Sequence, residues 1–402
     1  MLKVKSVAEV NRIVQDRFGG LSTGIEYVKL ESALNRVLAE DIVAAEFIPD
    51  FNRSTVDGYA VKAADVFGCS DAIPALLTQI GEASMGVHTS VKLEEGQCVY
   101  VPTGAEVPDG ADTMIMLEYA DNLGDEQIAI YRAFAPGTNM IFRGDDVKPG
   151  DTVFSVGKRI NVADSGALAA LGISEIPIQK HPRVAIISTG DELVHPDESL
   201  SPGKIRDVNA PMLVNAVLET GGEPHFLGIV RDDEQSVKTA MLSAIAHYDL
   251  LLISGGTSVG IKDAVPKVIS ELGELLVHGV AAKPGKPTLV GAIADVPVFG
   301  LPGNPVAAYF MFHMLARPLL YSMLRSAPLD RCVTVPLSRA VSSNHGREEF
   351  VPVTVKDGVA HAIASKSGLI TTLSRANGFI RIARDLEGLQ QGELVEVTLF
   401  AR

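Results

Sequence analysis

The segment from residue 183 to residue 324 alternates short apolar runs with amphipathic stretches, and this alternation limits the fold more than any other feature of the chain. The run Leu250–Ile253 is apolar at every position, which is typical of a strand in a parallel sheet with helices on both faces. Strands and helices that alternate over about 140 residues build a three-layer α/β unit. The pattern predicts strands at 184–188, 226–230, 250–253, 288–290 and 297–299, and helices at about 210–221, 234–247 and 263–272 and from 305 onward.

The sequence on either side of this unit predicts further domains of a different kind. From about residue 48 to 140, short β-type runs alternate with Gly, Pro and Asp clusters, which is typical of strands joined by tight turns. This block lies between two helical patterns, so we interpret it as an insertion into another domain. We expect a discontinuous N-terminal domain at 1–47 and 141–178, an inserted β-rich domain at 48–140, the α/β domain at 179–327 and a small β domain at 328–402.

The N-terminal region carries two helix signals. Ser6 and Glu9 have the spacing of a capping box, and apolar residues follow them at helical spacing up to Phe18. A second short helix is predicted at 32–39, with Ala33, Leu34, Val37 and Leu38 on its buried side.

The charge balance limits the partners that the chain can bind. Lys and Arg together number 35 and Asp and Glu 49, which gives a net charge of −14. A surface of that sign repels nucleic acid and anionic membranes, so we expect neither as a partner. An anionic small ligand would need a local cluster of donors.

The cysteines and the apolar runs indicate a cytoplasmic protein. Cys69, Cys98 and Cys332 lie far apart and form no metal-binding or disulfide pattern. The N-terminus leads into an amphipathic segment rather than an apolar signal core. No uncharged run reaches the ~18 residues that a membrane span needs.

The loops after the predicted strands are the first candidates for a ligand site. In an open α/β sheet, ligands bind beyond the carboxyl ends of the strands. Glycines let backbone N–H groups approach an anion there, and hydroxyl groups and helix starts add donors. A plain turn before a helix is the alternative interpretation of any one of these loops. The candidate binding residues are Ser188, Thr189, Gly190, Asp191, Ser254, Gly255, Gly256, Thr257, Ser258, Gly260, Pro302, Gly303, Asn304 and Pro305.

Lysines and carboxylates add charge to the same region. Lys283 and Lys286 lie between prolines in one stiff turn and are interpreted as an anion clamp, although lysines in turns are often only solvated. The carboxylates Glu192, Asp232 and Asp263 also follow predicted strands. Crowded carboxylates repel one another unless a cation intervenes, and Mg²⁺ beside phosphate uses one or two of them. They are therefore the candidate metal ligands.

These loops together resemble those of a known family, the MoeA/gephyrin E-domain family of molybdopterin molybdenumtransferases. Each matching stretch is short, but the stretches follow one another in order along nearly the whole chain. They are 32–41, 54–61, 102–105, 143–146, 188–193, 207–209, 231–233, 254–260 with Asp263, 283–287, 300–305, 346–350 and 367–370.

The resemblance implies an α/β plus β fold in an elongated protomer of four domains. The third is the molybdopterin-binding α/β domain, the second is the β-rich insertion and the fourth is a small β-barrel. It also implies a homodimer in which the active site is shared, so that Asp57 and Thr103 act on the α/β site of the partner protomer.

The implied reaction inserts molybdate into adenylylated molybdopterin and releases AMP, with help from Mg²⁺. The Ser254–Gly256 loop with Ser258, Lys283 and Lys286 would hold phosphate and the anionic groups of the pterin. The oxyanion would lie near these lysines and the 302–305 loop. The resemblance also suggests contact with the molybdopterin adenylyltransferase, and it leaves molybdate and tungstate undistinguished.

Two departures and two alternatives accompany the resemblance. Arg53 to Val56 stand where the family often has Asn-Ser-Ala-Met, and Asp145 stands where it often has Glu. A free-standing adenylyltransferase shares only the α/β domain, so the other motifs disfavour it. A scaffold without catalysis would leave these loops free to decay, whereas Glu192, Lys283 and Lys286 are present.

Overall fold

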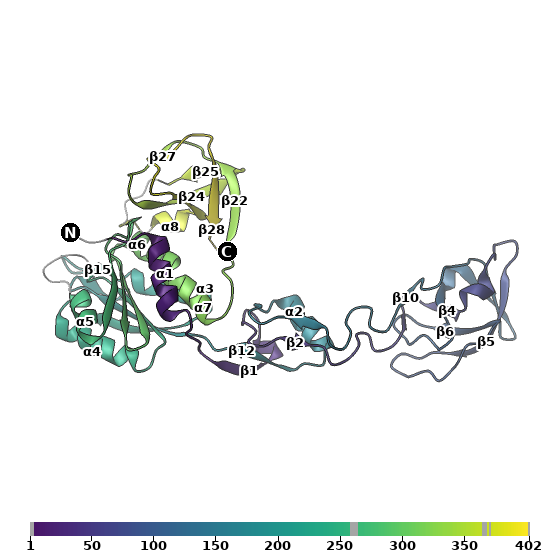
Figure 1. Ribbon diagram of the computed structural model, residues 1–402. Helices are drawn as coiled ribbons and strands as arrows, with labels where there is room; N and C mark the ends of the chain where they lie inside the picture. The colour runs from purple at the N-terminus through teal and green to yellow at the C-terminus, as the bar shows by residue number, and fades with distance from the viewer. Residues whose placement is uncertain (1–3, 258–263, 364–367, 370, 401–402) are drawn as a thin grey trace.

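The computed structural model of the chain describes residues 4–257, 264–363, 368–369 and 371–400. The molecule is elongated (Figure 1). An α/β unit and a C-terminal β unit lie at one end, a distal β unit lies at the other, and a small middle unit lies between them.

A six-stranded sheet is the centre of the α/β unit, with the strand order β16-β13-β17-β21-β20-β18. The four strands from β16 to β21 are parallel, whereas β20 pairs antiparallel with β21 and with β18. The sheet is mixed because Ala294 and Asp295 join β20 to β21 in a tight turn, with Ala294 at a φ of +52°, instead of a helical crossover. The strands are β13 (Arg183–Thr189), β16 (Glu223–Val230), β17 (Leu250–Ser254), β18 (Glu274–His278), β20 (Leu289–Ile293) and β21 (Val296–Leu301).

Helices cover both faces of this sheet, as the apolar runs predict. Ile186 and Leu252 pack on the face covered by α1, α3, α6 and α7, and Ile187 and Ile253 pack on the face covered by α4 and α5. The helices are α1 (Val7–Phe18), α3 (Asn209–Thr220), α4 (Glu234–Ile245), α5 (Ala264–Leu272), α6 (Pro305–Met311), the π-helical turn η4 (Phe312–Ala316) and α7 (Arg317–Met323). No helix in the described part of the chain combines the length and the apolar character that crossing a membrane requires.

The first helix packs on the α/β unit. The predicted Ser6–Glu9 capping box is present, and α1 buries Val7, Val10 and Phe18 in the same core as β13 and β17. This differs from the prediction that residues 1–47 belong to one N-terminal domain. The apolar stripe of α1 fits the surface of η4 and α7, so the chain enters the middle unit only after the helix has ended.

The middle unit consists of two short antiparallel pairs and one helix. Apolar side chains including Ala33 and Leu38 form its core. The predicted helix at 32–39 is wrong: Asn35 has a φ of +64°, in the left-handed region, and only a 3-10 turn precedes it. The elements are β1 (Ile25–Lys29) with β12 (Glu175–Gln179), β2 (Ile42–Val43) with β11 (Thr152–Phe154), η1 (Leu30–Ser32) and α2 (Val162–Ala170).

The distal unit is a six-stranded sheet with the order β7-β4-β6-β5-β9-β8. Its strands alternate with tight turns, as the sequence of 48–140 predicts. Two chain segments, 44–52 and 142–151, link it to the middle unit, and both end at the antiparallel pair of β3 and β10 (Figure 1). The elements are β3 (Arg53–Ser54), β4 (Gly58–Val61), η2 (Ala63–Val66), β5 (Ala75–Glu82), β6 (Gln97–Val101), β7 (Thr113–Met116), η3 (Leu117–Tyr119), β8 (Ala120–Gly124), β9 (Gln127–Ile130) and β10 (Met140–Ile141).

The C-terminal unit begins its sheet with a strand from the α/β unit. The order is β19-β24-β26-β28-β22, and β19 (Ala282–Lys283) pairs in parallel with β24. Among the described residues β19 and β22 are not paired with each other, so the closed barrel stays a prediction. The other elements are β22 (Arg331–Pro336), β23 (Val341–Ser342), β24 (Glu348–Lys356), β25 (Val359–Ala362), α8 (Thr371–Arg375), β26 (Gly378–Ile382), β27 (Gly388–Leu389) and β28 (Leu394–Leu399).

A partly buried histidine lies where the C-terminal unit packs on η4. His313 stacks on Tyr309 and contacts the edge of Phe379, and the Nη1 atom of Arg317 lies 3.2 Å from its Nε2. Burial, helped by the charge of Arg317, lowers the pKa of His313 to about 4, while Asp330 acts weakly in the opposite direction. The imidazole is therefore neutral at pH 7 and accepts a hydrogen bond from Arg317.

Replacing this histidine is expected to reduce the loss in the free energy of unfolding that occurs as the pH falls below 6.5. The unfolded His313 binds a proton near pH 6.5 and the folded one only near pH 4, so wild-type stability falls as the pH drops between these values. The contribution is about 1.4 kcal/mol per pH unit, and it is absent above pH 6.5. His313→Gln removes it, and urea unfolding at pH 4.5, 5.5 and 7 measures the difference.

His345→Gln is the matched control because His345 is exposed. An equal loss of stability between pH 7 and pH 4.5 in wild type and His313→Gln would contradict the assignment of a partly buried neutral imidazole.

Candidate active site

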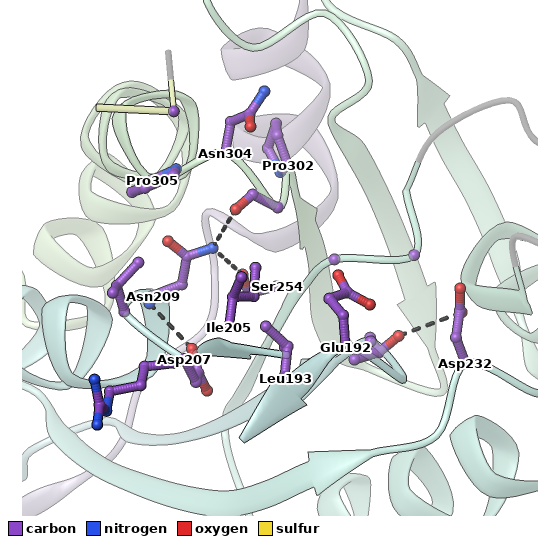
Figure 2. A pocket seen from close by; sticks show the side chains of 18 of the residues that line it. Glu192, Leu193, Ile205, Asp207, Asn209, Asp232, Ser254, Pro302, Asn304 and Pro305 are labelled. Atoms are coloured by element: carbon purple, nitrogen blue, oxygen red, sulfur yellow. Dashed lines mark hydrogen bonds between the residues drawn. The ribbon is translucent and has the colours of Figure 1, made fainter. Parts of the chain in front are cut away.

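The strand order of the α/β sheet reverses between β13 and β17. The crossover through α3 leads from β13 to β16 on one side, and the crossover through α4 then leads to β17 on the other side of β13. Ligands of open α/β sheets bind outside the carboxyl ends of the strands at such a reversal. A cavity of about 800 Å³ lies at this position, and we call it the first cavity (Figure 2).

Two glycines shape the floor of the first cavity. Gly255 has a φ of +98°, and a Cβ atom there would lie 2.2 Å from the carbonyl oxygen of Thr189. Its N–H donates to the carbonyl of Leu301 at 3.1 Å, which holds the loop against the end of β21. Gly256 has a φ of +58° and lies against the side chains of Asp232 and Thr189. Only glycine fits this conformation and this approach without strain.

The side-chain amide of Asn209 hydrogen-bonds to two segments of the cavity, the end of β17 and the loop after β21. Asn209, at the start of α3, donates from Nδ2 to Ser254 Oγ at 2.7 Å and to the carbonyl of Gly303 at 2.8 Å (Figure 2). Asp207 accepts from the backbone N–H groups of Asn209 and Ala210 at 3.0 and 3.1 Å and so caps the helix. The loops after β17 and β21 are thus fixed to the same helix end.

Two of the three predicted metal ligands line the first cavity. Glu192 lies over Gly190, and Asp232 accepts a hydrogen bond from Thr189 Oγ1 at 3.3 Å. The third, Asp263, lies outside the described residues. Among the described residues no group of three or more His, Cys, Asp or Glu side chains is arranged to hold a metal ion. The two carboxylates present are still a set that Mg²⁺ accepts when phosphate oxygens complete its shell.

Sequence reasoning missed the ribbon that covers the first cavity. The strands β14 (Leu193–Val194) and β15 (Ile205–Arg206) pair in parallel, and residues of the segment that they enclose line the cavity. The signal was present in the alternation of cation and apolar residue at Lys204, Ile205 and Arg206 after the turn at Pro202–Gly203. The lining residues that the ribbon and its flanks add are Leu193, Leu200, Lys204, Ile205, Arg206, Asp207, Val208 and Asn209.

The two lysines predicted as the anion clamp do not line the first cavity. Lys283 and Lys286 line a second cavity of about 590 Å³ between the α/β unit and the C-terminal unit. The second cavity adjoins the first, and the prediction of one site for the lysines and the strand-end loops stays a prediction. The pairing of β19 with β24 places Lys283 Nζ 3.0 Å from Oε1 of Glu349. Ser343 Oγ donates to the same carboxylate at 2.6 Å.

The two cavities adjoin along one wall. Pro287, Pro302 and Asn304 line both of them. The second cavity also receives Arg339 and Arg347 from the C-terminal unit, which sequence reasoning did not select. Cations from two units therefore surround a space next to the nucleotide-sized first cavity.

The other predicted site residues fall into three groups. Ser188 is fully buried below the first cavity, and Asp191 lines a small neighbouring hollow with Lys204. Ser258 and Gly260 lie outside the described residues. The residues that line the first cavity are Thr189, Gly190, Glu192, Asp232, Ser254, Gly255, Gly256, Thr257, Pro302, Gly303, Asn304 and Pro305.

Asp57 and Thr103 lie together on the distal unit. The backbone N–H of Thr103 donates to Asp57 Oδ1 at 2.7 Å, and both side chains are exposed. The distal unit lies at the opposite end of the molecule from the α/β unit (Figure 1). Within one chain, these residues therefore do not reach either cavity.

Comparisons with known proteins agree with the motifs along the chain. Three family models match: the MoeA N-terminal region, domains I and II, at residues 5–172, a probable molybdopterin-binding domain at 185–322, and the MoeA C-terminal region, domain IV, at 334–400. The chain is 36% identical to a putative molybdopterin biosynthesis protein of Methanocaldococcus jannaschii, over 93% of this chain and 92% of that protein. It is 33% identical to the molybdopterin molybdenumtransferase of Bacillus subtilis, over 93% and 89%.

A solved structure extends the likeness to the whole fold. The crystal structure of a molybdopterin biosynthesis MoeA protein from Pyrococcus horikoshii has a TM-score of 0.88 and 39% identity, and the match covers 100% of both chains. The fold is that of a multidomain α/β protein with a cavity at the carboxyl ends of its parallel strands. The chain belongs to the MoeA family, which confirms the resemblance seen in its motifs.

A methyl group at Gly255 is expected to disrupt the floor of the first cavity. Gly255→Ala places a Cβ atom 2.2 Å from the main-chain oxygen of Thr189 and strains a φ of +98°, so we expect a loss of about 1–3 kcal/mol in the free energy of unfolding. Gly166→Ala is the control. Gly166 lies in α2, and a Cβ atom added there would meet no side chain or other segment within 4 Å, so this change should raise the free energy of unfolding by about 0.5–1 kcal/mol. Urea unfolding measures both. Equal changes in the free energy of unfolding for the two substitutions would contradict the close approach of Gly255 to the carbonyl oxygen of Thr189.

Proposed function

We propose that this protein inserts molybdate into adenylylated molybdopterin and releases AMP. The shared wall of Pro287, Pro302 and Asn304 between the two cavities is the observation that carries the proposal. A reaction between a nucleotide-linked pterin and a separate oxyanion needs two neighbouring spaces with different chemistry. The relatives named molybdopterin molybdenumtransferase support the same reaction.

The first cavity suits the adenylylated pterin. Its volume of about 800 Å³ is within the range of sites for ligands of this size. Gly255 and Gly256 bring backbone close to a bound phosphate, and the buried hydroxyls of Ser254 and Thr257 lie on the same loop. We assign the pterin and nucleotide contacts to these loops and to the 302–305 loop.

The second cavity suits the oxyanion. Lys283 and Lys286 enter it from one turn, and Arg339 and Arg347 enter it from the C-terminal unit. Glu349 holds Lys283 by both carboxylate oxygens, at 3.0 and 3.1 Å, so the ammonium group is oriented before a ligand arrives. Molybdate, a dianion, would be stabilised by these cations next to the wall shared with the first cavity.

We propose Glu192 and Asp232 as the residues that hold Mg²⁺, together with Asp263. When bound, the ion would neutralise charge on the phosphate oxygens during cleavage of the adenylate. In the balanced reaction, the oxygen of a water molecule bonds to the pterin phosphate as the anhydride bond between the two phosphates breaks and AMP leaves. The two thiols of the pterin bond to molybdenum, and one molybdate oxygen leaves with their protons as water. The protein's own part is to hold the two phosphates on the Gly255–Gly256 loop and the oxyanion beside Lys283.

We further propose a homodimer with a shared site. Asp57 and Thr103 are hydrogen-bonded and exposed on the distal unit, far from the cavities of their own chain. The elongated shape allows the distal unit of one protomer to reach the α/β unit of its mate. Contact with the molybdopterin adenylyltransferase is proposed as well, since that enzyme makes the substrate. A cytoplasmic location fits the three unpaired cysteines, Cys69, Cys98 and Cys332.

AMP release tests the proposed reaction. Purified protein is given adenylyl-molybdopterin, molybdate and Mg²⁺, and AMP is measured by chromatography. We expect Lys283→Ala to lower kcat/KM by about 100-fold, because it removes a charge-assisted contact and leaves Glu349 unpaired. Lys180→Ala removes a lysine that is exposed and remote from both cavities, and it should behave as wild type. Absence of AMP release by the wild-type protein would reject the function.

Hybrid dimers test the shared site. Asp57→Ala and Lys283→Ala should each lose nearly all activity as homodimers. Mixed dimers place both changes in one of the two sites and leave the other intact, so about half of wild-type activity per hybrid dimer should return, which is about a quarter for a mixture at random exchange. Subunit exchange is confirmed with differently tagged chains. Confirmed exchange without recovery of activity would show that each chain uses its own Asp57.

A further inference from the structure

Two cations that line the first cavity donate hydrogen bonds to main-chain carbonyls. Lys204 Nζ donates to the main-chain carbonyl of Asp191, and Arg206 donates from Nε to the carbonyl of Pro196 at 2.9 Å and from Nη2 to that of Glu198 at 3.3 Å. Both side chains line the cavity. Within the described ranges of the chain, neither forms an ion pair with a carboxylate closer than 4.0 Å.

Some other lysines of the chain are neutralised by carboxylates. Lys283 pairs with Glu349, Lys238 with Glu271 and Lys267 with Glu234. In a chain with a net charge of −14, two cations bonded only to neutral carbonyls are therefore a local source of positive potential. A carbonyl oxygen accepts a hydrogen bond from the N–H group of Lys or Arg, but it is neutral and does not compensate the positive charge of the side chain. An ionised phosphate oxygen makes a shorter and stronger bond to the same donor.

The ribbon that carries these cations also has an apolar surface. Ile205 is 55% exposed and Leu200 is 51% exposed, and both line the first cavity. Arg206 directly follows Ile205, and Lys204 precedes it. A ligand with a flat ring and a phosphate group matches this alternation, because the ring covers apolar surface while the phosphate reaches the cations.

We propose that the β14–β15 ribbon is a phosphate clamp over the first cavity. When the ligand binds, the side chains of Lys204 and Arg206 give up their hydrogen bonds to main-chain carbonyls. They donate instead to oxygens of the phosphate that joins the ligand to its nucleotide. The proposal rests on the proposed function, because that function supplies a nucleotide phosphate as the ligand. It adds the two cations of the ribbon to the phosphate contacts of the Gly255–Gly256 loop, and it leaves Lys283 and Lys286 to the oxyanion in the second cavity.

The bonding pattern favours a clamp over a pair of solvated surface cations. A solvated Lys or Arg has no fixed partner, whereas Arg206 has two carbonyl partners on the ribbon segment and Lys204 has one in the loop after β13. These contacts preorganise both head groups at the mouth of the cavity, so less conformational entropy is lost when phosphate binds. The carboxylates Glu192 and Asp232 line the same cavity and would repel phosphate without such cations.

A matched pair of ligands tests the clamp. AMP and adenosine share the ring and the ribose and differ only in the phosphate, so the ratio of their Kd values measures the phosphate contacts. Isothermal titration calorimetry gives both values for the full-length protein. We expect AMP to bind wild type more tightly than adenosine, and we expect Lys204→Met and Arg206→Met each to weaken AMP by about tenfold. Adenosine affinity should stay unchanged, which shows that the cavity is intact.

Three controls sharpen the measurement. Lys204→Arg keeps the charge and should retain most of the AMP preference. Lys180→Ala removes an equal charge from a remote exposed position and should leave both Kd values unchanged. Raising the salt concentration should shrink the AMP preference in wild type and should have less effect in the ribbon variants.

The outcomes separate the clamp from the proposed function. Equal Kd values for AMP and adenosine in wild type, or an unchanged ratio in both methionine variants, would overturn the clamp even if AMP release continues. An equal loss of affinity for AMP and adenosine in these variants would also overturn it, since that result means a collapsed cavity wall. Absence of AMP release by the wild-type protein in the insertion assay would reject the proposed function. The ratio of the Kd values for AMP and adenosine would still test whether the ribbon binds phosphate.

Discussion

The bridging amide of Asn209 is the interaction on which the site depends. Its two N–H groups hold Ser254 and Gly303, the ends of two neighbouring strands, against the start of α3. Parallel strands bring their carboxyl ends to one edge, but they do not by themselves fix the loops that follow. Since Gly255 also donates to Leu301, the loop after β17 is held from two sides. The cavity is preformed because these buried polar bonds leave its floor only one arrangement.

A second constraint joins the C-terminal unit to this site. β19 belongs in sequence to the α/β unit, yet it forms the edge of the C-terminal sheet by pairing with β24. The register places Lys283 opposite Glu349, and the side chains meet. The second cavity thus exists only when both units are folded and docked. A small β unit far along the chain therefore has a direct part in arranging the cations beside the first cavity.

The apolar pattern predicted the α/β unit well because burial on both sheet faces requires continuous apolar strands, as in Leu250–Ile253. Local signals also found the capping box at Ser6 and the glycine loop at Gly255. The helix at 32–39 was wrong because apolar spacing does not reveal the left-handed Asn35. That the lysines line the second cavity was not predicted, because neither composition nor spacing shows that β19 pairs with β24. Lys204 and Arg206 were missed because their alternation with Ile205 spans only three residues, which is too short to distinguish a strand from a loop.

The separation of cations between the cavities follows from the charges that each has to hold. A phosphate of the pterin nucleotide and a free oxyanion are both anions, and in one cavity they would repel each other and compete for the same donors. Here the wall of Pro287, Pro302 and Asn304 keeps the two spaces distinct while leaving them adjacent. Lys283 is paired with Glu349, so an oxyanion binds there against a countercharge, whereas Lys204 and Arg206 have none among the described residues. The second cavity still presents four cations beside one carboxylate, whereas the first presents two cations beside Glu192, Asp207 and Asp232, so a phosphate in the first cavity needs the cations of the ribbon to offset these carboxylates.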